Sequence, residues 1–142
     1  QHLAAELLVR LRPHVNRDPI GAIALSMDTS TITACGNDYG YEHLFERNIR
    51  ALGQDGDVLI CISTSGMSKN LIYAADAAKS MHITTIGFLG KNGGELKKCC
   101  DYSLIIPSSV TARIQECHII LGHSLMEYLE DKLLKNHIIT KT

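Results

Sequence analysis

Residues 58–68 carry the strongest structural signal in this chain: Val58-Leu59-Ile60-Cys61-Ile62-Ser63-Thr64-Ser65-Gly66-Met67-Ser68. The first five residues form a continuous apolar run, which is typical of a strand buried on both faces of a parallel sheet. The next six contain four hydroxyl side chains and a glycine, and a helical pattern begins near Lys69. The segment therefore predicts a strand that passes through a polar loop directly into a helix.

Three other short apolar runs, at residues 20–25, 83–89 and 103–106, also predict strands. Helical patterns lie before, between and after these runs, at residues 1–12, 41–52, 69–81, 95–100 and 111–135. Strands that alternate with helices predict an α/β fold, in which a doubly wound parallel sheet is flanked by helices. Because no repeat or low-complexity stretch interrupts the pattern, we expect residues 1–142 to form a single domain.

The loops that follow the predicted strands are the expected ligand sites, because ligands of parallel sheets bind beside the carboxyl ends of the strands. These loops cover residues 26–38, 63–68, 90–94 and 107–111. In the 63–68 loop, Gly66 lets the backbone approach a ligand, and the hydroxyls can donate to an anion held at the helix start. The pattern favours an anion site, and a helix cap with spare serines is the alternative.

The composition excludes several classes of protein. The 142 residues carry 14 Lys and Arg against 15 Asp and Glu, a net charge of −1, so nucleic acid is not an expected partner. No apolar run is long enough for a membrane span. The five cysteines are odd in number and lack a C-x-x-C spacing, which disfavours a disulfide framework or a zinc ribbon and fits a reducing cytoplasmic compartment.

The first helical pattern carries a polar stripe. His2, Glu6 and Arg10 are spaced i, i+4 and i+8, so they share one face of the predicted helix. A histidine and a carboxylate one turn apart can share a metal ion or a proton. A solvated helix face explains the same spacing, and this alternative stays open.

The last helical pattern carries a second stripe, in which Gln115 and His123 lie two turns apart on roughly one face. Gly122 is a poor helix former, so its place beside His123 suggests that another group approaches the backbone there. Glu116 and His118 compete with Gln115 and His123 for a functional role. A histidine in an apolar helix can also be a hydrogen-bonded core residue.

Five motifs, taken in this order, resemble the phosphoheptose isomerase family of the sugar isomerase (SIS) superfamily. They are His2-Leu3-Ala4-Ala5-Glu6-Leu7, Gly36-Asn37-Asp38-Tyr39-Gly40, Gly56-Asp57-Val58-Leu59, Ile62-Ser63-Thr64-Ser65-Gly66-Met67-Ser68 and Arg113-Ile114-Gln115-Glu116-Cys117-His118. The resemblance implies a SIS-type sandwich and a cytoplasmic homotetramer of heptose biosynthesis. It also implies an aldose–ketose isomerase that converts sedoheptulose 7-phosphate to D-glycero-D-manno-heptose 7-phosphate through an enediol.

The resemblance implies roles for individual residues as well. Glu6 matches the catalytic base of the family, and His123 matches its second acid–base group. The implied substrate contacts are Arg10, Asn37, Asp38, Gln115 and the phosphate-holding loop residues Ser63, Thr64, Ser65 and Ser68. The implied cofactor is one zinc ion per subunit, on His2, Glu6, Gln115 and His123.

The chain departs from the family in two places. An Asn-Gly-Gly-Ser loop that follows a first strand in the family is absent, so we expect the chain to be the later part of a longer protein. Met67 stands where the family has Asn, and we do not expect Met67 to touch phosphate.

Two other functions are compatible with this fold. One is a non-catalytic SIS-domain protein that binds a replication initiator or senses a sugar phosphate. The relatives of that kind lack the Glu and the second His, so the presence of Glu6 and His123 favours the enzyme. The other is an isomerase that acts on a shorter phosphosugar.

Overall fold

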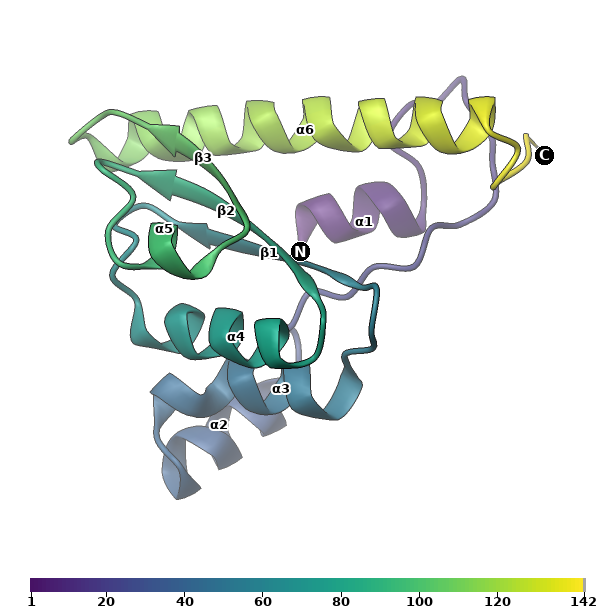
Figure 1. Ribbon diagram of the computed structural model, residues 1–142. Helices are drawn as coiled ribbons and strands as arrows, with labels where there is room; N and C mark the ends of the chain where they lie inside the picture. Colours follow the sequence, from purple (N-terminus) through teal and green to yellow (C-terminus); the bar gives the residue numbers. More distant parts are fainter. Residues whose placement is uncertain (142) are drawn as a thin grey trace. The chain divides into compact units, whose positions relative to one another are not determined.

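The computed structural model describes residues 1–141, which form two compact units. The terminal unit consists of Gln1–Met27 and the chain from Ile119 onward, and the sheet unit consists of Asp28–His118. Helix α1 (His2–Leu8) belongs to the terminal unit, and the last helix, α6 (Thr111–Lys135), runs from the sheet unit into the terminal unit (Figure 1). Within residues 1–141, none of the helices combines the length and the apolar content that a bilayer crossing requires.

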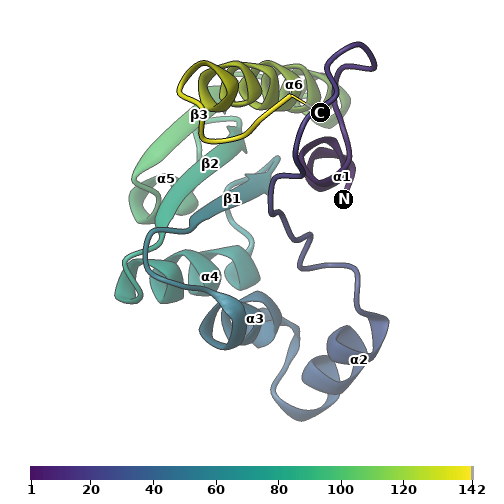
Figure 2. The ribbon, with the colours of Figure 1, turned by 90° about the vertical axis from the view of Figure 1, so that its right-hand side faces the viewer.

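The sheet unit contains a parallel sheet with the strand order β1-β2-β3, and Figure 2 shows the three strands side by side. The strands are β1 (Val58–Ser63), β2 (Thr84–Gly90) and β3 (Tyr102–Ile106). The helices α4 (Lys69–Ser80) and α5 (Leu96–Cys99) connect them in turn. Ahead of the sheet come α2 (Thr29–Asp38), the short 3₁₀ helix η1 (Tyr41–His43) and α3 (Leu44–Leu52).

Helices cover both faces of this sheet. Leu89 of β2 packs with Cys61 of β1 on one face, together with Ala75 of α4 and Leu96 of α5. The neighbouring residue Phe88 points to the opposite face, because side chains alternate along a strand. There its ring centre lies 6.1 Å from that of His118, in the first part of α6.

The prediction of an α/β fold with a parallel sheet flanked by helices is therefore confirmed. The helices predicted at 41–52, 69–81, 95–100 and 111–135 are present within a few residues of the expected bounds, with the first of them divided into η1 and α3. The strands predicted at 58–62, 83–89 and 103–106 are also present.

Two predicted segments are wrong. Residues 20–25 form no strand, and the backbone N–H of Ile20 donates to the carbonyl of Leu7 instead of to a neighbouring strand. Residues 26–38 are not a loop throughout, because α2 occupies the segment from Thr29 to Asp38. Asp28 starts this helix as its N-cap, and its carboxylate accepts a hydrogen bond from Ser30 N at 3.0 Å.

The first helix is shorter than predicted and ends at Leu8. In a continuing helix, the carbonyl oxygen of Glu6 would accept the backbone N–H of Arg10. The carbonyl oxygens of Glu6 and Leu7 instead accept hydrogen bonds from the guanidinium of Arg17, each at 2.9 Å. Arg10 consequently lies beyond the helix, and its predicted place on the helical stripe with His2 and Glu6 is wrong.

Candidate functional site

A cluster of polar side chains joins the two ends of the chain within the terminal unit. The Nε2 atoms of His2 and His123 lie 2.9 Å apart, and His2 Nε2 lies 3.3 Å from Glu6 Oε1. The spacing of His2 and Glu6 on α1 places both side chains on one face, and α6 supplies His123. His2 is exposed, whereas the side chain of Glu6 is 16% exposed, so the carboxylate is held in a partly enclosed position.

The two helices approach each other closely at Gly122. A Cβ atom added to Gly122 would lie 2.7 Å from Cδ1 of Leu3, so a larger residue would force the Leu3 side chain to move. The expectation that another group approaches the backbone beside His123 is confirmed, and the group is the side chain of Leu3. Leu3 directly follows His2 on α1, so the close contact at Gly122 lies next to the polar cluster.

The donor atoms of His2, Glu6 and His123 fit a metal ion. One ligand atom from each residue lies within 4.8 Å of the other two. Tetrahedral zinc with ligands at about 2.0–2.1 Å requires ligand atoms about 3.3 Å apart. Two imidazole nitrogens and a carboxylate oxygen are also a ligand set that suits zinc. A possible His–Glu–His metal site is therefore present in the terminal unit.

The same three groups can carry out acid–base chemistry. At 2.9 Å, one imidazole of the histidine pair donates its N–H and the other accepts it, so the two rings can pass a proton between them. Arg17 contacts the backbone carbonyl of Glu6 and not its carboxylate, so the carboxylate can act as a second acid–base group beside the two imidazoles. General acid–base catalysis needs this combination of a base and a proton relay.

The second candidate site is the 63–68 loop of the sheet unit. Ser63 Oγ accepts the backbone N–H of Gly66 at 3.0 Å, and Ser65 Oγ accepts that of Met67 at 3.2 Å. Ser68 is the N-cap residue of α4, but its side chain makes no capping hydrogen bond. The hydroxyl of Ser68 instead lies 3.5 Å from that of Ser63, so capping of the helix does not explain its position.

The 63–68 loop rests on the loop that follows β2. A Cβ atom at Gly66 would lie 2.0 Å from the carbonyl oxygen of Gly93, and one at Gly94 would lie 2.5 Å from that of Gly66. Both glycines have positive φ angles, +66° and +56°. The carbonyl of Gly66 accepts the N–H of Leu96, and the sulfur of Met67 lies 3.4 Å from the N–H of Glu95. The two loops therefore support each other through their backbones.

The other residues expected at the site lie in different places. Asn37 and Asp38 are the last two residues of α2, rather than part of a loop, and Asn37 Nδ2 donates to Asp38 Oδ1 at 2.7 Å. Gln115 is exposed on α6, in the sheet unit, and Arg10 is exposed beyond the end of α1. His118, the competitor of His123, is buried against Phe88, and within residues 1–141 its ring nitrogens have no hydrogen-bond partner.

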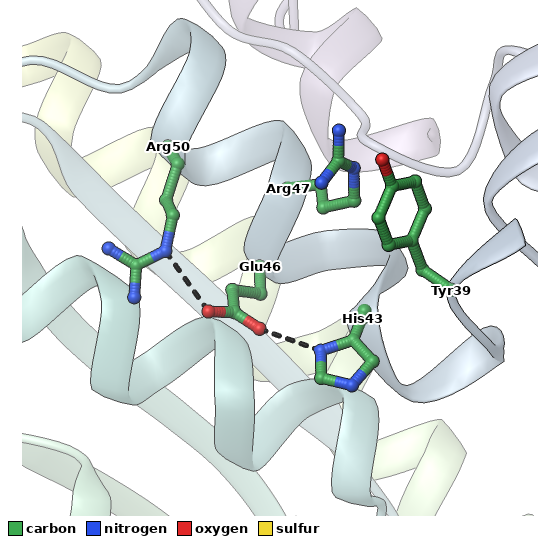
Figure 3. A pocket seen from close by; sticks show the side chains of 5 residues that line it. All are labelled: Tyr39, His43, Glu46, Arg47 and Arg50. Atoms are coloured by element: carbon green, nitrogen blue, oxygen red, sulfur yellow. Dashed lines mark hydrogen bonds and ion pairs between the residues drawn. The ribbon is translucent and has the colours of Figure 1, made fainter.

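A separate polar cluster lines a cavity of about 330 Å³ in the sheet unit (Figure 3). Glu46 Oε1 accepts a hydrogen bond from Arg50 Nε at 3.0 Å, and Glu46 Oε2 lies 2.9 Å from His43 Nδ1. Arg47 lies 3.9 Å from the ring centre of Tyr39. The hydrogen bonds from His43 and Arg50 hold the pKa of Glu46 below its usual value. Because these side chains pair with one another, the cluster joins η1 to α3.

Sequence reasoning missed a third group, the buried charges of the terminal unit. Arg17 is 6% exposed and Glu130 is 0% exposed, and Arg17 Nε donates to Glu130 Oε2 at 2.6 Å. Arg12 Nε donates to the other carboxylate oxygen at 2.8 Å. The two arginines lie near prolines in an irregular segment, and no periodic pattern connects that segment to Glu130.

Comparison with known proteins gives a consistent set of matches. The model of the SIS domain family matches residues 1–90. The chain is similar to the phosphoheptose isomerase of Clostridium acetobutylicum, with 51% identity over 133 residues, or 94% of this chain and 67% of that protein. It is similar to the phosphoheptose isomerase of Paramagnetospirillum magneticum, with 52% identity over 92% of this chain and 67% of that protein. The chain thus spans about two thirds of the length of these relatives.

Solved structures give the same result. The phosphoheptose isomerase from Neisseria gonorrhoeae superimposes with a TM-score of 0.85 and 42% identity, over 92% of this chain and 68% of that one. The phosphoheptose isomerase from Francisella tularensis superimposes with a TM-score of 0.84 and 38% identity, over 89% of this chain and 67% of that one.

Proposed function

This chain belongs to the phosphoheptose isomerase family of SIS-domain proteins, and we propose that it converts sedoheptulose 7-phosphate to D-glycero-D-manno-heptose 7-phosphate. The observation that supports this function best is the cluster of Glu6, His2 and His123, which unites a carboxylate with two imidazoles. In this proposal residues 1–142 act as one SIS-type domain, located in the cytoplasm, in a homotetramer.

The reaction moves one proton between neighbouring carbons and a second proton between their oxygens. Glu6 removes the proton from C1 of the ketose, while His123 donates a proton to the carbonyl oxygen on C2, which gives the enediol. His123 then takes the proton from the hydroxyl on C1, and Glu6 returns its proton to C2, which gives the aldose. Because both groups end in their starting states, the cycle needs no external acid or base.

The phosphate end of the sugar binds to the 63–68 loop. The hydroxyl oxygens of Ser63 and Ser65 already accept backbone N–H groups, which leaves their O–H hydrogens for phosphate oxygens. Thr64 and Ser68 supply further hydroxyls beside the first turn of α4, which favours an anion. The remaining substrate contacts in this proposal are Arg10, Asn37, Asp38 and Gln115.

A zinc ion, one per subunit, fits the donor set of His2, Glu6 and His123. In this proposal Gln115 supplies the fourth ligand. When bound, zinc supplies a positive charge that polarises a carbonyl oxygen and stabilises an enediolate. A carboxylate that binds a cation is a weaker base. Glu6 therefore serves either as a metal ligand or as the base at a given moment. The contact with His2 Nε2 keeps the Glu6 carboxylate in a position from which it can take either role.

The non-catalytic alternative is disfavoured. A protein that only binds a replication initiator or senses a sugar phosphate has no need for a base within 4.8 Å of two imidazoles. Two relatives that are 51% and 52% identical to this chain are both named phosphoheptose isomerase.

A coupled assay with sedoheptulose 7-phosphate tests the proposal. We expect Glu6→Gln to abolish turnover, since an amide cannot accept the carbon-bound proton, and we expect His123→Gln to do the same. Glu42→Gln, an exposed glutamate on η1, is the matched control and should turn over normally. Binding of the sugar phosphate, measured by calorimetry, should persist in both inactive variants. Turnover by Glu6→Gln at a near-normal rate would remove Glu6 from the mechanism, and retention of an initiator protein by an inactive wild type would favour the alternative.

A further inference from the structure

The buried charges of the terminal unit have no part in the reaction described above. The side chains of Arg17 and Glu130 are both 1% exposed, and their nearest atoms lie 2.6 Å apart. Removing two charges from water is costly, and a buried ion pair often contributes little to net stability. The ion pair with Glu130 therefore does not by itself account for the burial of Arg17.

One of the other contacts of Arg17 is local, from NH1 to the carbonyl of Asp18 at 2.9 Å, and the others go to the end of α1. The guanidinium NH1 atom donates to the carbonyl of Leu7, and NH2 donates to the carbonyl of Glu6, each at 2.9 Å. The last carbonyls of a helix have no partner within the helix, so Arg17 supplies a donor to that of Glu6 and, together with the N–H of Ile20, to that of Leu7. α1 has only seven residues, no side-chain cap at its start and no basic residue in its last turn. A helix this short is not stable without such support.

Glu130 connects the same guanidinium to the helix that carries His123. Glu130 and His123 are seven positions apart on α6, which places them on one face of the helix, two turns from each other. Glu130 Oε2 holds Arg17, and Glu130 Oε1 accepts Arg12 Nε at 2.8 Å. A chain of contacts thus runs from α6 through Glu130 and Arg17 to the backbone of the residue that bears the candidate base.

We propose that Arg17 is a positioning residue for the isomerase: held by Glu130, it fixes the carbonyl end of α1 and thereby the place of Glu6 opposite His123. The inference rests on the proposed function. Arg17 touches neither substrate nor the reacting atoms, and it acts through the backbone of Glu6. Loss of the Arg17 guanidinium should disturb the geometry of proton transfer by Glu6 and His123, and it should leave phosphate binding by the 63–68 loop unchanged.

The substitution that isolates this role is Arg17→Lys. Lysine keeps the positive charge beside Glu130, but a single ammonium cannot reproduce the planar guanidinium that serves Glu130 together with the carbonyls of Glu6, Leu7 and Asp18. Arg12→Lys is the matched control, because Arg12 also donates to Glu130 while its other contacts go to Glu127 and Asp131. Both variants make the same chemical change next to the same carboxylate, and only one of them releases α1.

The first measurement is steady-state kinetics in the full chain. We expect kcat of Arg17→Lys to fall about 10- to 100-fold, the range that a misplacement of about 1 Å produces, with KM within twofold of wild type. Arg12→Lys should keep a kcat close to that of wild type. An equal loss of kcat in the two variants would assign the effect to Glu130 alone and overturn the proposal, and so would a KM that rises in step with the fall of kcat.

The second measurement does not depend on turnover. His2 and Glu6 come from α1 and His123 from α6, so displacement of α1 should weaken Zn²⁺ binding about 10- to 100-fold, as the loss of supporting contacts does at other metal sites. Competition with a chromogenic chelator measures this affinity. Equal Zn²⁺ affinities in wild type, Arg17→Lys and Arg12→Lys would overturn the positioning role. If the wild type lacks isomerase activity, the proposed function fails, whereas the comparison of Zn²⁺ affinities still decides the role of Arg17.

Discussion

Ser63, Ser65 and Ser68 differ in how their hydroxyl groups are used, although all three belong to one loop. Ser63 is 6% exposed and its oxygen holds the N–H of Gly66, so it maintains the shape of the loop as well as offering a donor. Ser65 holds the N–H of Met67 from a more open position. Ser68 caps no N–H of α4. Substitution of the last two therefore tests ligand binding with the smallest effect on the loop itself.

Ser65→Ala and Ser68→Ala should each raise the KM for the sugar phosphate. A hydrogen bond to a charged group contributes about 1.5–3 kcal/mol, which corresponds to about 10- to 100-fold in KM. The value of kcat should change little, because in the proposed function the loop holds the end of the sugar that does not react. Ser80→Ala is the control, since its hydroxyl donates to Ala77 O within α4. A fall in kcat at constant KM would contradict a phosphate-binding role.

Glu46 makes a testable contribution to stability. Hydrogen bonds from His43, and then from Arg50, lower its pKa from the ordinary value of 4.5. A carboxyl group with a lowered pKa in the folded state stabilises the protein above its unfolded pKa, and this stabilisation disappears as the pH falls through the folded value. Glu46→Gln should thus lower the urea midpoint at pH 7, and this difference from wild type should shrink as the pH falls through the folded pKa of Glu46.

The matched control for this experiment is Glu95→Gln. Glu95 pairs with Lys98, but both side chains are more than half exposed, at 53% and 71%, so removing the charge should change the urea midpoint at pH 7 only slightly. A difference between Glu46→Gln and wild type that stays constant from pH 7 to pH 3 would show that the charge of Glu46 is not responsible.

At the scale of elements, the loops after β1 and β2 behave as one structure. Gly94→Ala would place a Cβ atom 2.5 Å from the carbonyl oxygen of Gly66 at a φ of +56°. The left-handed backbone alone costs about 1–2 kcal/mol, and the clash adds to this value. We expect a lower urea midpoint and a higher KM for the sugar phosphate, because the clash displaces the 63–68 loop, which we propose binds the phosphate.

Gly56→Ala provides the comparison that separates strain from contact. Gly56 also has a positive φ, +87°, but a Cβ atom there meets no atom within 4 Å. Gly56→Ala should lower the free energy of unfolding only by the cost of the left-handed backbone, about 1–2 kcal/mol, and should keep a KM close to that of wild type. If Gly94→Ala behaves like Gly56→Ala in KM, the loop after β2 does not shape the phosphate site.

The ends of helices show where sequence reasoning succeeds and where it fails. The start of α4 at Lys69 is predictable, because a polar loop and a helical pattern meet there. The start of α2 carries a local signal as well, since Asp28 is a good N-cap residue, but the many hydroxyl residues of 26–38, together with Gly36, favour a loop. The end of α1 carries no local signal. It depends on Arg17, which binds Glu6 and Leu7 from ten or more residues away.

At the scale of the molecule, the sheet is predictable because right-handed crossovers place consecutive parallel strands beside each other, and the order β1-β2-β3 follows. The candidate site is only half predictable. Helical spacing identifies His2 with Glu6, and separately Gln115 with His123, as polar stripes. That His2 meets His123 across 121 positions of the chain is a tertiary fact that spacing does not contain, and the family resemblance supplied that link.

The possible metal ligands His2, Glu6 and His123 come from both ends of the chain, so an ion bound to them would act as a crosslink within the terminal unit. A ligand that binds only the folded state stabilises it by about 2.7 kcal/mol at a concentration of 100 times its Kd. Removal of Zn²⁺ by a chelator should therefore lower Tm by several degrees, and added Zn²⁺ should restore it, since closing the link between α1 and α6 opposes their separation. His2→Ala should abolish the dependence of Tm on Zn²⁺, because it removes one imidazole of the cluster, whereas the exposed His14 makes His14→Ala a control that keeps it. A Tm that depends on Zn²⁺ equally in both variants would place the ion elsewhere. A wild-type Tm that does not change with Zn²⁺ would mean that the cluster works by proton transfer between carboxylate and imidazole without a bound ion.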